Sequence, residues 1–80
     1  KYPQVLINVK DVAKEKLDES TAIKTAVDKI EKELNGGGRV LLRASGTEAL
    51  VRVMVEASTD TLASNIATEL AEVVKRELGK

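Results

Sequence analysis

The sequence has no cysteine, no histidine, no tryptophan and no phenylalanine, and its one aromatic residue is Tyr2. Without cysteine the chain can form neither a disulfide framework nor a thiolate metal site. Without histidine it cannot carry a Ser-His-Asp triad or a histidine-ligated zinc ion. The scarcity of aromatics also removes a stacking platform for nucleic-acid bases. The core must therefore be built from valine, leucine, isoleucine and alanine.

Charge and hydropathy exclude further classes of protein. The 13 Lys and Arg residues balance the 13 Asp and Glu residues, whereas nucleic-acid modules carry a basic excess. No apolar run approaches the ~20 residues of a membrane-spanning helix, and no signal peptide is visible. These features predict a protein with no nucleic-acid or membrane partner, and a single domain over residues 1–80. The start at Lys1 rather than methionine indicates a piece of a longer protein.

Three short segments have the composition of β-strands. They are residues 5–10, 39–43 and 50–57, all rich in valine or leucine. Successive side chains of a strand point to opposite faces of the sheet, so alternate residues share a face. One face is predicted to carry Val5, Ile7, Val9, Val40, Leu42, Val51, Val53 and Val55. The opposite face then carries Leu6, Asn8, Leu41, Arg43, Leu50, Arg52, Met54 and Glu56.

Two further segments have the i, i+3, i+4, i+7 spacing of a helix with one buried face. The first begins at Ser20 or Thr21 and ends at the run 35–38, where glycines stop the helix. This run is followed by a strand rather than by the helix that a phosphate cradle needs. The predicted stripe of the first helix is Ile23, Ala26, Val27, Ile30 and Leu34. The second helix begins at Ser58, Thr59 or Asp60, ends at Gly79, and buries Leu62, Ile66, Ala67, Leu70, Val73, Val74 and Leu78.

The order strand, helix, strand, strand, helix predicts an α+β protein. We expect a two-layer β-α-β-β-α sandwich with both helices on one face of a small mixed sheet. A right-handed crossover places the third strand between the other two, in the order 2-3-1, with the first strand parallel to the second. The charged, weakly patterned segment 11–19 is predicted to be a loop.

The turn between the second and third strands carries more functional groups than a hairpin requires. It lies within R-A-S-G-T-E-A-L-V-R-V, from Arg43 to Val53. Both arginines fall on the uncovered face, where like charges repel unless an anion or a carboxylate lies between them. Guanidinium forks, hydroxyls and turn amides suit a phosphate. The pattern by itself nevertheless favours an ordinary hairpin whose arginines pair with Glu48 or Glu56.

The longer stretch R-A-S-G-T-E-A-L-V-R-V-M-V-E resembles the phosphate-binding loop in the last domain of the α-D-phosphohexomutases. The Arg-x-Ser-Gly-Thr-Glu core occurs across that superfamily. The continuation R-V-M-V-E, the opening Y-P-Q-V-L-I-N-V-K and the segment G-G-G-R-V-L-L-R are most similar to the bacterial phosphoglucosamine mutases. The resemblance covers nearly the whole chain, and only residues 11–19 are unspecific. Ala49 departs from the proline that is usual in the family, which puts the rigidity of the loop in doubt.

The resemblance implies the TATA-box-binding-protein-like last domain of a four-domain cytoplasmic enzyme. Such an enzyme interconverts glucosamine 6-phosphate and glucosamine 1-phosphate, on the route to UDP-N-acetylglucosamine and peptidoglycan precursors. A phosphoserine and a magnesium ion, both held by other domains, serve the transfer. We therefore expect this chain to be monomeric, to contain no catalytic residue or metal site, and to contact the phosphosugar and the other domains.

The resemblance also assigns the residues of the site. The last domain clamps the phosphate that is not being transferred, and Glu48 supports the loop. The positions implied to contact the phosphate are Arg43, Ser45, Gly46, Thr47 and Arg52.

Two other functions fit the sequence. Another phosphohexomutase, acting on phosphomannose, phosphoglucose or N-acetylglucosamine phosphate, would share the phosphate loop, because sugar recognition lies in a different domain. A non-enzymatic α+β binding module would share the helix-backed sheet. The lack of aromatics and the zero net charge argue against an RNA-binding module.

Overall fold

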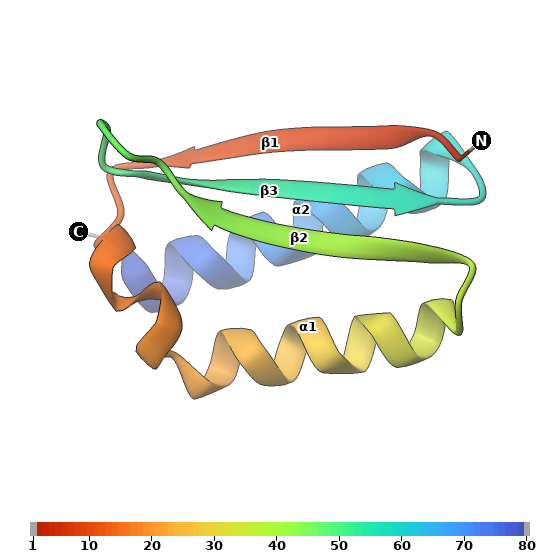
Figure 1. Cartoon of the computed structure of the whole chain (residues 1–80), viewed down its shortest axis with the longest axis horizontal. Coiled ribbons are helices and arrows are strands. Elements are labelled where there is room, and N and C mark those ends of the chain that lie inside the picture. Colours follow the sequence, from red (N-terminus) through yellow and green to blue (C-terminus); the bar gives the residue numbers. More distant parts are fainter. Residues whose placement is uncertain (1, 80) are drawn as a thin grey trace.

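The computed structural model describes residues 2–79 of the chain (Figure 1). Within these residues a three-stranded sheet forms one layer and two α-helices form the other, which confirms the predicted α+β sandwich. A short 3₁₀ helix, η1, precedes the first α-helix. The elements in chain order are β1 (Gln4–Lys10), η1 (Lys14–Glu19), α1 (Thr21–Leu34), β2 (Gly38–Ala44), β3 (Leu50–Ala57) and α2 (Asp60–Leu78).

The last strand, β3, lies in the centre of the sheet between β1 and β2. Both neighbours pair with it antiparallel, so β1 and β2 run in the same direction without pairing. The predicted strand order is confirmed, but the predicted mixed sheet is wrong, because every pairing among the described strands is antiparallel. The crossover through α1 carries the chain past the central position, and the short turn after β2 returns β3 into the gap as an antiparallel partner.

Side-chain caps define where both α-helices begin. Ser20 Oγ accepts a hydrogen bond from Ile23 N–H at 3.2 Å, and Thr59 Oγ1 accepts one from Leu62 N–H at 3.1 Å. Such caps satisfy amide groups that have no carbonyl partner inside the helix. At the other end of α1, Asn35 adopts the left-handed conformation with a φ of 47°. The predicted starts of both helices and the predicted end of α1 are therefore confirmed.

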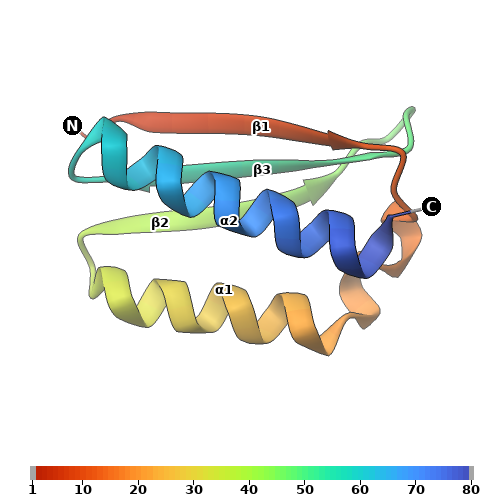
Figure 2. The same cartoon turned by 180° about the vertical axis from the view of Figure 1, so that it is seen from behind.

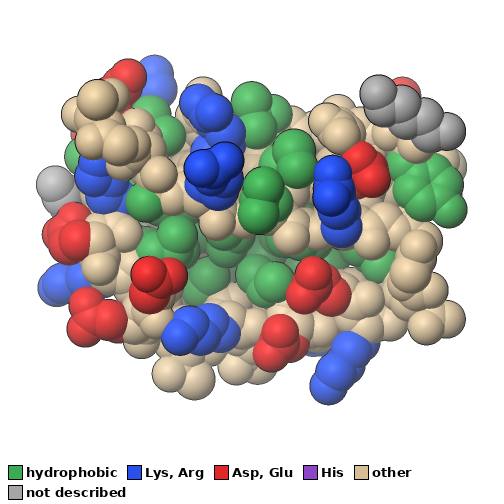
Figure 3. Space-filling view, viewed as in Figure 1, with side chains coloured by type: hydrophobic (Ala, Val, Ile, Leu, Met, Phe, Trp, Pro, Cys, Tyr) green, Lys and Arg blue, Asp and Glu red, His purple; other side chains and the backbone are tan. Residues whose placement is uncertain are grey.

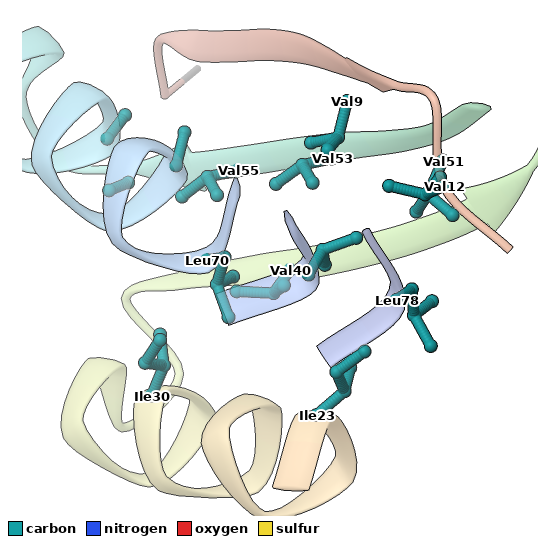
Figure 4. Packing of buried hydrophobic residues seen from close by; sticks show 14 residues of the cluster. Val9, Val12, Ile23, Ile30, Val40, Val51, Val53, Val55, Leu70 and Leu78 are labelled. Atoms are coloured by element: carbon teal, nitrogen blue, oxygen red, sulfur yellow. The ribbon is translucent and has the colours of Figure 1, made fainter. Parts of the chain in front are cut away.

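The helix-facing side of the sheet forms the core together with both helices (Figure 4). Val51, Val53 and Val55 of β3 are completely buried, and Val9 and Val40 on the neighbouring strands are nearly so. This pattern confirms the predicted division of the strand residues between two faces. The other predicted members of this face pack against the core while remaining partly exposed, and they are Val5, Ile7 and Leu42.

The helix α2 packs on the sheet through a stripe that includes Ala63 in place of the predicted Leu62. Ala63 and Ala67 are completely buried, whereas Leu62, which was predicted to be buried, is 39% exposed. Because alanine is small, it lets the helix backbone lie close to the sheet and leaves the larger Leu62 at the flank. The remaining predicted residues are buried or packed against the core, and they are Ile66, Leu70, Val73, Val74 and Leu78.

The segment before α1 is not the loop that its sequence predicts. Residues 14–19 form η1, and Val12 is completely buried, next to Val51 in Figure 4. Ala13 N–H donates a hydrogen bond of 2.7 Å to the carbonyl of Leu78, at the end of α2. A single apolar residue has no periodicity, so its burial could not be inferred until the end of α2 was known to lie beside it.

The second face of the sheet is not covered by a helix of the described chain, as Figures 1 and 2 show from opposite sides. In Figure 3, hydrophobic side chains lie on this face beside those of Lys and Arg. Leu6 is 54% and Leu41 is 45% exposed. Leu50 was predicted to be uncovered here as well, but it is only 6% exposed. It stays outside the helix-facing core, and the turn after β2 folds beside it.

We expect the 80-residue chain to fold on its own, because its strands, helices and caps are mutually consistent. Far-ultraviolet circular dichroism in plain buffer should show both helix and strand, and urea should unfold the chain in one cooperative transition. A spectrum typical of a mainly disordered chain at room temperature would contradict this expectation.

The burial of Val12 predicts a stability difference between two truncations. Val12→Ala should lower the free energy of unfolding by about 1.5–3 kcal/mol, because it leaves a cavity in the core. Leu6→Ala removes a larger side chain from the exposed face and should cost less than about 0.5 kcal/mol. Urea unfolding of both variants measures the difference. Equal costs would show that residues 11–13 are not part of the core.

Candidate functional site

The connection between β2 and β3 is folded around one hydroxyl group. Ser45 Oγ accepts hydrogen bonds from Thr47 N–H at 3.3 Å and from Glu48 N–H at 3.2 Å. Ser45 N–H donates to the carbonyl of Leu50 at 3.0 Å, which closes the base of the turn. Serine commonly organises turns in this way, because its side chain substitutes for a backbone acceptor. The turn therefore holds a defined shape at the ends of the two strands.

Two arginines flank this turn on the uncovered face of the sheet. Arg43 on β2 lies directly opposite Arg52 on β3 in the antiparallel register. Asn8 on β1 lies opposite Arg52 on its other side, so the three residues form one row across the sheet. Arg52 Nε donates a hydrogen bond of 3.4 Å to Asn8 Oδ1. The amide of Asn8 thus orients one of the two guanidinium groups.

Neither arginine of this row is neutralised by a carboxylate among residues 2–79. Glu56 instead lies 3.7 Å from Arg39 Nε and accepts a 2.7 Å hydrogen bond from Gln4. The side chain of Glu48 forms no ion pair with a described residue, although its main chain takes part in the turn. Arg43 and Arg52 therefore lack the glutamate partners that an ordinary hairpin would give them. Like charges directly opposite each other are unfavourable, which makes this row a place where an anion would be attracted.

The two arginines and the turn line an open hollow of about 280 Å³. Leu50 is nearly buried at its side and supplies an apolar wall, while the arginines and the turn supply donors. Thr47 and Glu48 lie in the exposed part of the turn and do not line it. Four of the five residues implied to contact phosphate are thus brought together. The complete lining is Arg43, Ala44, Ser45, Gly46, Leu50 and Arg52.

The glycine of this turn is not required by the fold. Gly46 has no positive φ, and a Cβ built on it meets nothing within 4 Å. Gly38 differs, because a Cβ there would lie 2.1 Å from the carbonyl of Glu56. Since the chain itself could accept a larger residue at position 46, the open space beside Gly46 is available to a group that approaches the backbone from outside.

Two polar residues near the turn were not identified from the sequence as members of the site. Asn8 had been placed on the uncovered face by strand parity, and its register opposite Arg52 makes it a partner of that arginine. Lys14 lies in the segment that was predicted to be an unspecific loop, yet its Nζ donates to the carbonyl of Ser45. No local sequence signal marks Lys14, because the contact joins residues that are far apart in the chain.

A larger hollow, of about 810 Å³, runs along β1 and α2. It contains lysines and acidic residues together, among them Lys10, Asp11, Glu72 and Lys75. Such a mixture of charges does not select an anion or a cation. The smaller hollow at the turn, with its two arginines, is therefore the better candidate for a binding site.

A metal site and a membrane-spanning helix both have requirements that can be compared with the described residues. Residues 2–79 contain no group of three or more His, Cys, Asp or Glu side chains that could hold a metal ion. Neither of the α-helices described is long and apolar enough to cross a membrane. The residues present do not fit a magnesium ion.

Known proteins are similar to this chain over nearly its whole length. Residues 6–73 match the family described as the phosphoglucomutase/phosphomannomutase C-terminal domain. The chain is 48% identical over 79 residues to a phosphoglucosamine mutase of Bacillus velezensis and 51% identical over 79 residues to one of Staphylococcus aureus. Each alignment covers 99% of this chain but only 18% of the relative. The chain therefore spans less than a fifth of the length of these relatives.

Solved structures of related enzymes contain a domain with the same fold as this chain. The N-acetylphosphoglucosamine mutase of Aspergillus fumigatus, in complex with GlcNAc-6P and magnesium, aligns over 95% of this chain with a TM-score of 0.78 and 30% identity. A variant of that enzyme in complex with glucose 1,6-bisphosphate aligns over 100% of the chain with a TM-score of 0.84 and 27% identity. Each match covers 16% of the longer protein. By sequence and by fold, the chain belongs to the C-terminal domain family of the phosphoglucomutases and phosphomannomutases.

Proposed function

We propose that this chain is the C-terminal domain of a phosphoglucosamine mutase and that its turn between β2 and β3 binds the phosphate group of a phosphosugar. The family match and the phosphoglucosamine mutases that are about half identical to it support the first part. The observation that carries the second part is the facing pair Arg43 and Arg52, which has no carboxylate partner in the described chain.

The geometry suits a phosphate for three reasons. Each guanidinium group presents a planar fork of donors that matches two phosphate oxygens. An anion between Arg43 and Arg52 converts their mutual repulsion into two attractions. The hydroxyl of Ser45 and the backbone at Gly46 add neutral donors at the open side of the hollow. Thr47 is the next residue of the turn, and its hydroxyl is proposed to reach the phosphate from the exposed side. None of these groups distinguishes one sugar from another, so the site recognises the phosphate alone.

This selectivity fits the reaction of a phosphohexomutase. Glucosamine 6-phosphate and glucosamine 1-phosphate interconvert through a bisphosphorylated sugar that turns around in the active site. The clamp must therefore accept a phosphate from either end of the sugar. Phosphoryl transfer itself is assigned to a phosphoserine in another domain, and the described residues offer no site for magnesium.

We also propose a place for the domain in its parent enzyme. The exposed side chains of Leu6 and Leu41 lie on the same face as the arginine row, and uncovered apolar surface often marks an interface. We assign this face to the active-site cleft and to contact with the preceding domains. The enzyme is proposed to work in the cytoplasm and to supply the precursor of UDP-N-acetylglucosamine and peptidoglycan. The separate 80-residue chain should be a monomer.

A second candidate is a phosphoglucomutase or phosphomannomutase, since the matching family carries both names. The phosphate clamp would be the same, and the sugar would be selected by another domain. Rates of the full-length enzyme with glucosamine 6-phosphate, mannose 6-phosphate and glucose 6-phosphate separate the candidates. A clear preference for mannose or glucose phosphate would overturn the assignment to glucosamine.

We predict that the 80-residue chain binds inorganic phosphate and glucosamine 6-phosphate but not glucosamine. The dissociation constant should be near the millimolar level, about −4 kcal/mol, because ordering the turn and its long side chains opposes binding. Amide chemical-shift titration should move Ser45, Gly46 and Thr47 with the two phosphates only. No movement in the turn up to tens of millimolar phosphate would refute the clamp.

Substitution of single arginines sharpens this test. Arg43→Ala should weaken phosphate binding by at least about tenfold, because a charge-assisted hydrogen bond is lost. Arg43→Lys should weaken it as well, since lysine keeps the charge but not the planar fork. Arg39→Ala is the matched control: it removes the same charge from the same face of β2, but Arg39 pairs with Glu56. The affinity of the Arg39→Ala variant for phosphate should stay close to that of the original chain.

Gly46 provides a prediction that separates binding from stability. Gly46→Ala should change the free energy of unfolding by less than about 0.5 kcal/mol, because the new Cβ meets nothing within 4 Å. It should nevertheless weaken phosphate binding about threefold or more, because the Cβ occupies the space that the ligand enters. Gly38→Ala, the control, should cost about 1–3 kcal/mol of stability. Unchanged phosphate affinity in Gly46→Ala would show that the ligand does not approach this backbone.

A further inference from the structure

The phosphate turn is held from outside the hairpin by the segment that precedes η1. Lys14 Nζ donates a hydrogen bond of 2.5 Å to the carbonyl oxygen of Ser45. At the other end of the turn, Val12 N–H donates to the carbonyl of Ala49 at 3.3 Å. Both ends of the turn are therefore attached to the same short segment, residues 12–14.

That segment is itself anchored in the core. Val12 is completely buried and forms an antiparallel bridge with Gly79. Ala13 N–H donates to the carbonyl of Leu78 at 2.7 Å. The position of Lys14 is thus determined by the end of α2 and by the packing of Val12, and Figure 1 shows that η1, the turn and the end of α2 lie at one end of the molecule.

The hydrogen bond from Lys14 acts on the peptide group that joins Ser45 to Gly46. A trans peptide is planar, so its N–H points away from its C=O. When Lys14 holds the carbonyl of Ser45, it also sets the direction of the Gly46 N–H. This N–H has no acceptor within residues 2–79, and Gly46 lines the hollow beside the two arginines. A cation on the carbonyl also polarises the peptide and strengthens the N–H as a donor.

We propose that Lys14 is a positioning residue of the phosphate turn, which fixes and polarises the Ser45–Gly46 peptide so that Gly46 N–H donates to the bound phosphate. This inference rests on the proposed phosphate-binding function. It adds a residue from outside the Arg-Ser-Gly-Thr stretch to the site. It also gives the buried segment at Val12 a role in binding, because that segment carries Lys14 to the turn.

The experiment compares three variants of the 80-residue chain with inorganic phosphate as the probe. Lys14→Met keeps the apolar stem and removes the ammonium group; Lys14→Arg keeps a cationic donor. Lys16→Met is the control, because Lys16 belongs to the same 3₁₀ helix, is exposed and makes no side-chain hydrogen bond with a described residue. The change of the amide chemical shifts during the titration gives the phosphate affinity. Before phosphate is added, the chemical shift of the Gly46 amide reports whether the environment of its N–H has changed. Urea unfolding reports the stability of each variant.

Lys14→Met should weaken phosphate binding about three- to tenfold, less than Arg43→Ala, because the hydrogen bond from Gly46 N–H to the phosphate is weakened and not removed. It should also shift the Gly46 amide in the absence of phosphate, and Lys14→Arg should restore much of both properties. Lys16→Met should change neither beyond the small effect of one surface charge. Thermodynamic stability should remain high enough for all three variants to be folded throughout the titration.

The outcomes separate this inference from the function on which it rests. If the original chain binds phosphate and Lys14→Met binds it equally well, or if Lys16→Met weakens binding as much as Lys14→Met, the positioning role is wrong and the clamp remains. If the original chain does not bind phosphate at all, the clamp itself is wrong, and the role of Lys14 in it fails too. A Gly46 amide that is unchanged in Lys14→Met would also overturn the inference.

Discussion

The pairing of β3 with both of its neighbours is the constraint on which the rest of the structure depends. The odd-numbered residues of β3 are completely buried in the core, and its even-numbered residues point to the uncovered face. A slip of one residue in the register would send Val51 and Val53 toward solvent and Arg52 toward the core. The hydrophobic burial of one face therefore locks the geometry of the other, and Arg52 remains between Arg43 and Asn8.

The arginine row shows how a binding site is compatible with a stable sheet. Two like charges opposite each other cost roughly 0.2–1 kcal/mol, and solvent screens much of this repulsion because both arginines are exposed. The cost is small beside the burial of the valines on the opposite face. The domain can therefore keep an unneutralised pair of cations in place, and a bound anion would remove the repulsion as it binds.

The turn between β2 and β3 is organised from three directions. Ser45 folds it from within, the strands hold its base, and residues 12–14 attach both of its ends to the segment anchored at α2. This arrangement bears on Ala49, which stands where the resembling family usually has proline. Proline stiffens a chain by restricting its own φ, whereas here the carbonyl of Ala49 is held by Val12 N–H. Residue 49 is thus held by a hydrogen bond from another element, and this bond does not depend on a proline at the position.

The sequence by itself determined the features that depend on neighbours along the chain. The alternation of valines settled which strand residues face the helices, and serine, threonine and asparagine settled where helices begin and end, because capping and strand parity are local. The stretch from Arg43 to Arg52 likewise indicated phosphate chemistry, although its pairing with glutamates stayed open until the register showed Glu56 beside Arg39.

Only the tertiary structure decided the rest. The antiparallel sheet follows from the crossover through α1 and the turn after β2. The burial of Val12 and the outward position of Leu62 depend on where α2 packs. The contacts Asn8–Arg52 and Lys14–Ser45 join residues 44 and 31 positions apart. Such contacts follow from strand register and helix placement, and no local periodicity encodes them, because each is formed only after distant elements have packed together.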